Sequence, residues 1–371
     1  MDIPSGYTFT SKAKIACRLQ LALYELKQSP QAWFGRFSSA MRKYGCQQSN
    51  TDHTLFLKHR VGKVTALIIY VDDMIITGDD VEEISKLQEQ LSTEFEMKNL
   101  GGLEYFLGIE VARSKQGIFL SRRKYILDLL AEIGFLECKP ADTPIIQNHK
   151  LGEYLDQVPA DKQKYQRLVG KLIYLSHTCL DIAYTVSVVS QFMHCPSKDH
   201  MDVVMQILRY LKSSLGKGLM FSKNDHLNVD GYIDVDWARN ITDRKSTSSY
   251  FTFVGGNLVT WRSKKQKVVA LPNAEAEFRG MVKGLCELLW LKKLLVEIGF
   301  APSSEMNLFC DNKAAIDISH NLVQHDCTKH VEVDRNFIKQ NLEKKIIKVV
   351  STRNFYNSLD KLGIRDIYAP T

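Results

Sequence analysis

The 371-residue sequence predicts a mixed α/β (α+β) protein with three regions. Two kinds of pattern support this fold class: short apolar runs of strand length, and longer segments with apolar residues at helical spacing. A polar stretch with three prolines, residues 140–161, is predicted to be a linker after the first region. At roughly 150 residues per domain, the length allows two or three domains, each able to bury a core.

The composition is that of a globular chain. Hydrophobic residues make up 44% and aromatic residues 10%, which excludes low-complexity disorder and collagen-like repeats. The best apolar run, residues 64–77, is interrupted by two aspartates and is shorter than the ~18 residues of a membrane span. The acidic N-terminus does not fit a signal peptide, and the eight scattered cysteines include no C-x-x-C pair. We therefore expect an intracellular protein with reduced thiols, no membrane contact and no zinc site.

In the first region, two hairpins are expected, each followed by a helix. The hairpins are predicted at Ala66–Tyr70 with Met74–Thr77 and at Tyr105–Ala112 with Gly117–Leu120, and the helices at Val81–Met97 and Arg123–Ile133.

After the linker, two helical patterns precede a third region that begins near Leu227. That region has the order of three strands, helix, strand and two helices, which is an α/β layout with a mixed sheet. The predicted helices are Tyr165–Gln191, Met201–Ser213, Ala274–Leu295, Asn312–Ile318 and Val331–Leu342, and the strands are Val229–Ile233, Tyr250–Val254, Leu258–Trp261 and Met306–Cys310.

Asp72 and Asp73 lie at the tip of the first predicted hairpin. Turns favour aspartate, so two solvated acids are an ordinary interpretation. Stiff strands that hold two carboxylates beside a groove also suit Mg²⁺, which prefers oxygen ligands. In phosphoryl transfer, such carboxylates hold two ions roughly 3.5–4 Å apart.

The first two regions resemble the reverse transcriptases of copia-type LTR retrotransposons. The matching segments follow one another up to about residue 225: Leu23–Trp33 (LYELKQSPQAW), Ser49–Phe56 (SNTDHTLF), Tyr70–Met74 (YVDDM), Tyr105–Val111 (YFLGIEV), Gly170–Ser176 (GKLIYLS) and Asp181–Ser187 (DIAYTVS). The YVDD box alone is a weak signal, whereas the ordered series is very specific. The resemblance implies that Asp72 and Asp73 bind the metal ions of a polymerase.

The resemblance also implies where nucleic acid binds. Two sets of residues are implied to touch it: Lys27, Gln28, Ser29 and Pro30 at the incoming nucleotide and template, and Phe106, Leu107 and Gly108 at the primer grip. A lysine beside an acidic metal site suits a phosphate-bearing ligand, although a solvated lysine is an equally ordinary interpretation. Polymerases of this type use a third aspartate upstream of the segment matching residues 1–7, and have glycine where this chain has Glu25. We therefore expect a remnant that does not extend a primer on an RNA template.

The third region carries a second set of acids. Two follow the first strand, two occupy the first turn of the long helix and one ends the fourth strand: Asp234, Asp236, Glu275, Glu277 and Asp311. Strand-end acids with one helix acid are the layout of a two-metal nuclease. Each acid taken alone is more ordinarily a solvated or helix-capping residue, and the set together favours the nuclease.

Residues 232–334 resemble the RNase H domain that follows reverse transcriptase in copia-type elements. The motifs are Tyr232–Ala238 (YIDVDWA), Asp243–Tyr250 (DRKSTSSY), Thr260–Gln266 (TWRSKKQ), Ala274–Phe278 (AEAEF), Cys310–Ile316 (CDNKAAI) and Thr328–His330 (TKH). Glu275 and Glu277 are about 200° apart on a helix, so only one faces the site, and Glu277 shares the apolar stripe. Glu277 and Asp234 also match the family's metal ligands better, with Asp236 in reserve.

A basic cluster around Trp261 (Arg262, Lys264, Lys265 and Lys267) suits the backbone of a hybrid, although a solvated hairpin edge is nearly as ordinary. His330 is either close to leaving-group chemistry or simply a packed or surface histidine. The family's fourth acid is absent because the chain runs from Lys348 into sequence from beyond it, as after an internal deletion. Several family positions are changed as cytosine deamination would change them, namely Cys179, Leu180, Arg239, Ser249, Pro272, Asn273, Leu322 and Cys327.

Together these features predict a fragment of an RNA-directed DNA polymerase with RNase H. The expected parts are a partial right-hand palm and fingers (1–135), a linker with thumb- or connection-like helices (136–226), an RNase H-like mixed-sheet domain (227–345) and a C-terminal tail (346–371). Mg²⁺ or Mn²⁺ is the expected cofactor. RNA template, DNA primer, RNA–DNA hybrid and deoxynucleotides are the expected partners, and the oligomeric state is open. The alternative is a non-enzymatic nucleic-acid-binding remnant, or a decayed chain without function.

Overall fold

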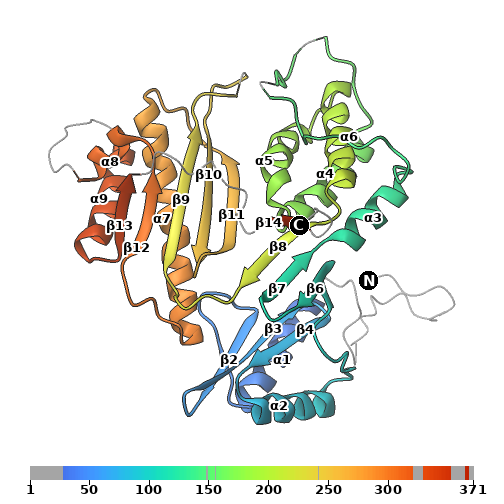
Figure 1. The fold of residues 1–371 in the computed structure, drawn as a ribbon, viewed down its shortest axis with the longest axis vertical. Coiled ribbons are helices and arrows are strands. Elements are labelled where there is room, and N and C mark those ends of the chain that lie inside the picture. The colour runs from blue at the N-terminus through green and yellow to red at the C-terminus, as the bar shows by residue number, and fades with distance from the viewer. Residues whose placement is uncertain are drawn as a thin grey trace, which may run out of the picture. The chain divides into compact units, whose positions relative to one another are not determined.

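The computed structural model describes residues 28–147, 149–154, 156–240, 242–320, 329–351 and 364–366. The chain divides into two compact units, Met1–Asn99 and Leu100–Thr371. Both units contain helices and strands, which confirms the mixed α/β (α+β) fold class (Figure 1). Within the described ranges, no helix combines the length and the apolar character that crossing a membrane requires.

The first unit is an antiparallel sheet with two helices. Its strands lie in the order β1 (Gln47–Gln48), β2 (Leu55–Arg60), β3 (Lys63–Tyr70) and β4 (Asp73–Gly78), and its helices are α1 (Ser29–Lys43) and α2 (Val81–Glu94). Phe37 and Met41 of α1 pack against Phe56 and Leu67 of the sheet and Leu91 of α2. The helix α2 begins where the sequence predicts, because the Asp80 side chain accepts the backbone N–H of Glu83 and caps it.

The predicted first hairpin is confirmed by the pairing of β3 with β4, in which Tyr70 faces Asp73. Asp73 is therefore the first residue of β4, and only Val71 and Asp72 form the loop. Val71 has φ of 53°, a left-handed conformation that a β-branched residue rarely adopts. The loop backbone is thus strained beside the two aspartates.

One part of the second unit consists of an antiparallel sheet and a cluster of packed helices. The sheet has the order β14 (Ile364–Asp366), β8 (Lys217–Ser222), β7 (Gly117–Ser121), β6 (Ile109–Arg113) and β5 (Tyr105–Phe106), all antiparallel. The helices are α3 (Arg123–Glu132), α4 (Lys162–Ser176), α5 (Leu180–Val189), the 3-10 turn η1 (Ser190–Phe192) and α6 (Lys198–Ser213). Tyr165, Leu172 and Leu208 are fully buried between these helices.

The helix predicted at Tyr165–Gln191 is two helices, α4 and α5, because the backbone leaves the helical conformation at Cys179, whose ψ is 92°. Two other expectations for this part need correction. The predicted strand Tyr105–Ala112 is interrupted by a tight turn at Leu107 and Gly108, so that β5 ends before the turn and β6 begins after it. Both residues have positive φ, 48° for Leu107 and 74° for Gly108. The strands β8 and β14 were not predicted, because each is short and has no clear alternation of apolar and polar residues. Residues 140–161 contain no helix or strand among those described, as expected of a linker.

The second sheet is mixed, as predicted for the third region. Its order is β11 (Asn257–Lys265), β10 (Thr247–Val254), β9 (Val229–Asp236), β12 (Met306–Cys310) and β13 (Ile347–Ser351), with β12 parallel to both neighbours. The helices are α7 (Asn273–Ile298), α8 (Lys313–His320) and α9 (Lys329–Glu343). The strand β13 lies in the segment expected to be a tail, where Ile347 and Val349 point into the core.

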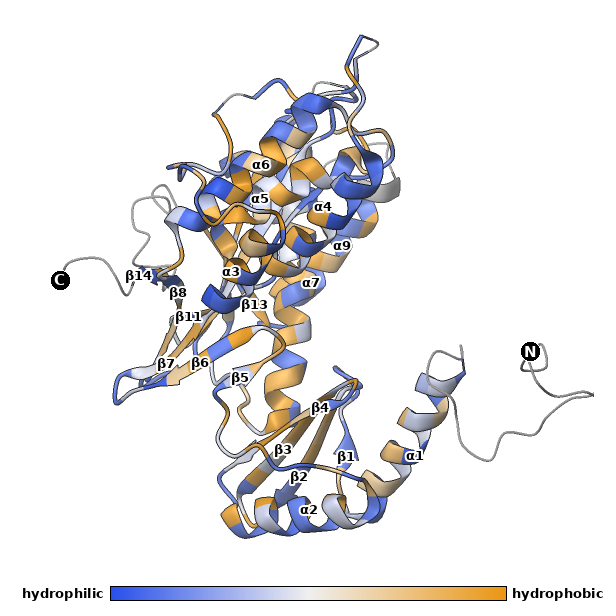
Figure 2. Ribbon diagram, turned by 90° about the vertical axis from the view of Figure 1, so that its right-hand side faces the viewer, coloured by the Kyte–Doolittle hydropathy of each residue, from blue (hydrophilic) through white to orange (hydrophobic). Residues whose placement is uncertain are grey.

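Helix α7 lies unusually close to β9, the central strand of this sheet. A Cβ atom added to Gly280 would lie 2.7 Å from Val235 Cγ2, and one added to Gly284 would lie 2.7 Å from Ile233 Cγ2. The helix carries hydrophobic residues along most of its length (Figure 2). Its buried face therefore sits directly on the strand, which fixes how far its N-terminal turns stand from the sheet.

We predict that Gly284→Ala lowers the free energy of unfolding. Overpacking costs about 1–3 kcal/mol, and the better helix propensity of alanine returns only about 1 kcal/mol. The matched control is Gly170→Ala in α4, where nothing lies within 4 Å of an added Cβ. We expect that variant to gain roughly 0.5–1 kcal/mol. Urea unfolding followed by circular dichroism measures both, and equal stability of the two variants would contradict the close approach.

Candidate metal centre

Three acids from separate elements of the second unit converge at one end of the mixed sheet. Asp234 lies on β9, Asp311 directly follows β12, and Glu277 lies near the start of α7. The parallel register pairs Phe309 with Tyr232, so the two aspartates extend from the same end of neighbouring strands. Ligand atoms of Glu277 and Asp311 lie within 4.8 Å of each other, together with that of Cys310.

Glu277 is the buried member of this group. Only 5% of its surface is exposed, and its Oε2 atom has no hydrogen-bond partner. Burial, followed by the negative charges of Asp311 and Asp234, raises the pKa of Glu277 to about 8. A divalent cation would relieve this repulsion, and carboxylate oxygens are the ligands that Mg²⁺ and Mn²⁺ prefer.

The structure separates the two acids that the sequence left as alternatives. Glu275 forms an ion pair with Arg279 at 2.7 Å. Asp236 receives two hydrogen bonds from Arg239, both at 3.2 Å. Each alternative acid is thus neutralised by its own arginine, whereas Glu277 is exposed to the charges of Asp234 and Asp311.

Gln266 positions the start of α7 and was missed by the sequence analysis. It is 3% exposed, and its Nε2 atom donates to the Ala276 carbonyl at 2.9 Å and to Ser248 Oγ at 2.8 Å. These bonds tie the residue before Glu277 to β10. The sequence signal was present, because Gln266 ends the TWRSKKQ motif, but its partners are distant in the chain.

The helix itself begins without a side-chain cap. Pro272 occupies the N-cap position with φ of −80°, which proline adopts without strain. Proline is therefore tolerated at this position. By contrast, Arg239 and Ser249 are not among the described residues with positive φ, so neither position needs glycine for its backbone.

The basic cluster differs from the expectation in one respect. Trp261 donates its indole N–H to the Ser176 carbonyl at 3.0 Å and packs against buried residues, so its ring is committed to the fold. Arg262, Lys264 and Lys267 are exposed, whereas Lys265 pairs with Asp243 at 2.9 Å. Lys283 of α7 joins them: burial and then the positive charges of Lys264, Arg262 and Arg279 lower its pKa.

In the first unit, Asp72 and Asp73 are both exposed on the hairpin. Among the described residues, no third acid, histidine or cysteine joins them in a cluster of metal-ligating atoms. Gln28 is the N-cap of α1, and Ser29 and Pro30 begin that helix. Lys27 and Glu25 lie outside the described residues, as does the side chain of His330.

The expected primer-grip residues Phe106, Leu107 and Gly108 form the β5–β6 turn of the second unit. The Leu107 carbonyl accepts bonds from Arg122 Nη1 at 3.1 Å and from the Tyr174 hydroxyl at 2.6 Å. Arg122 is 5% exposed, and its guanidinium lies 4.5 Å from the centre of the Tyr174 ring. These two residues hold the strained turn, and nothing in the sequence indicated them.

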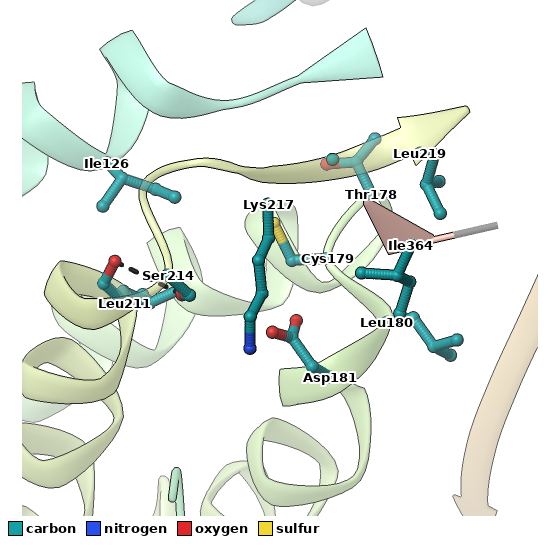
Figure 3. Close-up of a pocket in the computed structure, with 11 residues that line it drawn as sticks. Ile126, Thr178, Cys179, Leu180, Asp181, Leu211, Ser214, Lys217, Leu219 and Ile364 are labelled. Atoms are coloured by element: carbon teal, nitrogen blue, oxygen red, sulfur yellow. Dashed lines mark hydrogen bonds between the residues drawn. The ribbon is translucent and has the colours of Figure 1, made fainter. Parts of the chain in front are cut away.

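A hollow of about 350 Å³ lies elsewhere in the second unit, between the start of α5, the end of α6 and β8 (Figure 3). In the figure, the Lys217 ammonium points toward the Asp181 carboxylate. Tyr210 links the two, since it donates to Asp181 at 2.7 Å and accepts from Lys217 at 3.0 Å. The polar groups of this hollow are therefore satisfied by one another, and the acid cluster is the stronger candidate site.

Known proteins resemble the chain along most of its length. The family described as "Reverse transcriptase (RNA-dependent DNA polymerase)" matches residues 1–147. The retrovirus-related Pol polyprotein from transposon RE1 of Arabidopsis thaliana is 36% identical over 350 residues, which are 94% of this chain and 24% of that protein. The chain belongs to the retrotransposon Pol family. The resemblance to copia-type elements, inferred from the motifs, is thereby confirmed.

The chain thus spans about a quarter of the length of that Pol polyprotein. A second relative, "Uncharacterized mitochondrial protein AtMg00810" of Arabidopsis thaliana, is 38% identical over 60% of this chain and 93% of its own length. Among solved structures, a foamy viral protease-reverse transcriptase in complex with an RNA/DNA hybrid aligns over 90% of this chain and 39% of that one. Its sequence identity is 12% and its TM-score 0.47.

We predict that Glu277→Gln stabilises the metal-free chain at high pH. Because the folded-state pKa is raised from 4.5 to about 8, the favourable contribution of the protonated acid is complete below pH 4.5 and is lost as the pH rises through about 8. The advantage of the variant should grow by on the order of 3 kcal/mol between pH 5 and pH 9. Urea unfolding in EDTA measures it.

The matched control for this experiment is Glu275→Gln, which removes a carboxylate two residues away that is paired with Arg279. Its stability difference from the parent should not grow with pH. An advantage of Glu277→Gln that stays constant across this pH range would contradict the clustering of the three acids.

Proposed function

We propose that residues 229–351 form a metal-dependent ribonuclease H unit of this Pol chain, which cleaves the RNA strand of RNA–DNA hybrids. The single observation that carries the proposal is the grouping of Asp234 and Asp311 around Glu277, a buried acid whose pKa their charges help to raise and whose Oε2 atom has no hydrogen-bond partner. A buried carboxylate oxygen without a hydrogen-bond partner is unfavourable for stability alone, so the Oε2 atom of Glu277 points to a ligand.

The three carboxylates fit Mg²⁺ or Mn²⁺, since the set offers hard oxygen atoms and one of these lacks any other partner. Asp234, Glu277 and Asp311 would hold the ion. When bound, such an ion supplies positive charge to the attacking and leaving oxygens of phosphodiester hydrolysis. With three acids instead of the family's four, one ion is held firmly and a second only weakly, so we expect slow cleavage.

The basic surface of the same unit supplies the substrate-binding part of the proposal. Arg262 and Lys264 on β11 lie close enough to Lys283 on α7 for their positive charges to repel its ammonium group. An anion bound among the three side chains would relieve this repulsion. Phosphate groups of a nucleic acid provide that anion. Such contacts carry no sequence information, so affinity should fall steeply with salt concentration.

For the remainder of the chain, the proposal follows the family to which it belongs. Asp72 and Asp73 are the metal ligands of the RNA-directed DNA polymerase, Phe106, Leu107 and Gly108 are the primer grip, and Lys27 to Pro30 contact the nucleotide and template. The strained hairpin loop at Val71 and the clamped Leu107 carbonyl support these roles, because strained backbone is often kept at functional sites. Template RNA, primer DNA and deoxynucleotides are the corresponding partners.

The nuclease proposal predicts Mg²⁺-dependent cleavage of a labelled RNA–DNA hybrid by the full chain. Asp234→Asn and Glu277→Gln should each lower the rate by about 10²–10³, as expected when an electrostatic contact to the reacting centre is lost. The matched controls are Asp236→Asn and Glu275→Gln, whose parent residues are paired with arginines outside the cluster. These two variants should cleave within a few-fold of the parent.

Two results would overturn the proposal. If the cluster variants cleave as fast as the parent, any cleavage observed comes from another source. If the parent binds the hybrid with steep salt dependence but shows no cleavage with Mg²⁺ or Mn²⁺, the chain is a nucleic-acid-binding remnant. Double-stranded DNA of the same sequence serves as the substrate control, and it should remain intact.

A further inference from the structure

The acid cluster contains a sulfur atom. Cys310 is the last residue of β12, fully buried on the same face as Met306 and Leu308. Its Sγ and one carboxylate oxygen each of Glu277 and Asp311 all lie within 4.8 Å of one another. Of the free cysteines that the structure describes, none other belongs to such a group.

Two further observations separate this thiol from an ordinary packed cysteine. The Sγ atom has only one weak polar contact, 3.9 Å from the Asn312 carbonyl. The Oε2 atom of Glu277, on a residue that is 5% exposed, also has no hydrogen-bond partner. The buried thiol and the buried carboxylate lie close together without bonding each other, so both can serve as donors to a common ligand.

The metal preference of this trio differs from that of the acids alone. A hard ion such as Mg²⁺ prefers oxygen ligands and gains little from the sulfur atom of Cys310. Zn²⁺ and Cd²⁺ bind thiolate and carboxylate ligands together, and Zn²⁺ takes four ligands in tetrahedral geometry.

We propose that Glu277, Cys310 and Asp311 form a binding site for one thiophilic divalent cation, of which Zn²⁺ is the physiological type. On binding, the Cys310 S–H bond is replaced by an S–metal bond and the proton is released to solvent. The fourth position is left for Asp234 or water. Because Glu277 and Asp311 are shared, Zn²⁺ excludes Mg²⁺ and stops hydrolysis. Only this inhibitory consequence rests on the proposed nuclease function.

Binding is measured first, because it does not depend on activity. The full chain is titrated with Zn²⁺ by calorimetry in excess Mg²⁺, and with Cd²⁺ while the ultraviolet sulfur-to-cadmium charge-transfer band is recorded. Cys310→Ser and Cys310→Ala should both weaken Zn²⁺ binding at this site by at least about 100-fold, since losing even an outer partner of a metal ligand costs about 10–100-fold. The matched control is Cys286→Ser, at an exposed cysteine of α7.

The control should keep the parent's affinity and its cadmium band. Equal Zn²⁺ affinity of the parent and both Cys310 variants, each folded by circular dichroism, would overturn the proposal, and so would Cd²⁺ binding without a Cys310-dependent band.

The second readout is the ratio of hybrid cleavage rates with and without Zn²⁺, which should be low for the parent and close to one for Cys310→Ser. If Zn²⁺ binds through Cys310 while cleavage continues unchanged, Zn²⁺ and Mg²⁺ do not compete for Glu277 and Asp311, and the inhibitory part of the proposal is refuted. If nothing cleaves the hybrid, the nuclease function fails and the binding data still decide the site.

Discussion

The seating of α7 on β9 is the constraint on which the site depends. Gly280 and Gly284 let the helix axis approach a central strand until even an added Cβ atom would collide with the side chains of Val235 and Ile233. That closeness places Glu277 over the end of the sheet, where Asp234 and Asp311 extend from parallel neighbouring strands. Gln266 holds the first turns of α7 in place, because its side chain donates hydrogen bonds to the Ala276 carbonyl and to Ser248 of β10. The acids are thus brought together by packing against apolar residues, and electrostatics oppose the result.

The unfavourable electrostatics of this cluster distinguish it from the neighbouring acids of the unit. Three neighbouring acids of the unit are each paired with a base: Asp236 with Arg239, Glu275 with Arg279 and Asp243 with Lys265. At Glu277 burial and like charge act together, and the partial positive charge at the N-terminus of α7 offsets only a fraction of the cost. A cation that binds the folded state alone would return the stability that this arrangement gives up.

Most of the fold could be predicted from local patterns. The strand Met306–Cys310 matches β12, and the hairpin around Asp72 and the helix from Ala274 were found because each has a clear apolar period and a turn or cap. The prediction of Glu277 rather than Glu275 rests on helical geometry, on the apolar stripe that Glu277 shares and on the match to the family. The elements that were not predicted are the helix α1 and the strands β1, β2, β8, β13 and β14. Short strands such as β1 and β14 are fixed by their neighbours in a sheet. Arg122 and Gln266 act through carbonyl groups that lie 15 and 10 residues away in the chain. The bond from the Trp261 indole N–H to the Ser176 carbonyl joins residues 85 positions apart, which no local pattern indicates.

Crystals of the full chain soaked in Mn²⁺ offer the most direct test, because anomalous scattering locates the ion without any assay of activity. We predict one strong peak coordinated by oxygen atoms of Asp234, Glu277 and Asp311, at the end of β9 and β12. A Glu277→Gln crystal treated in the same way should lose that peak. Saturating Mn²⁺ with all three acids ordered and no ion among them would contradict the metal centre.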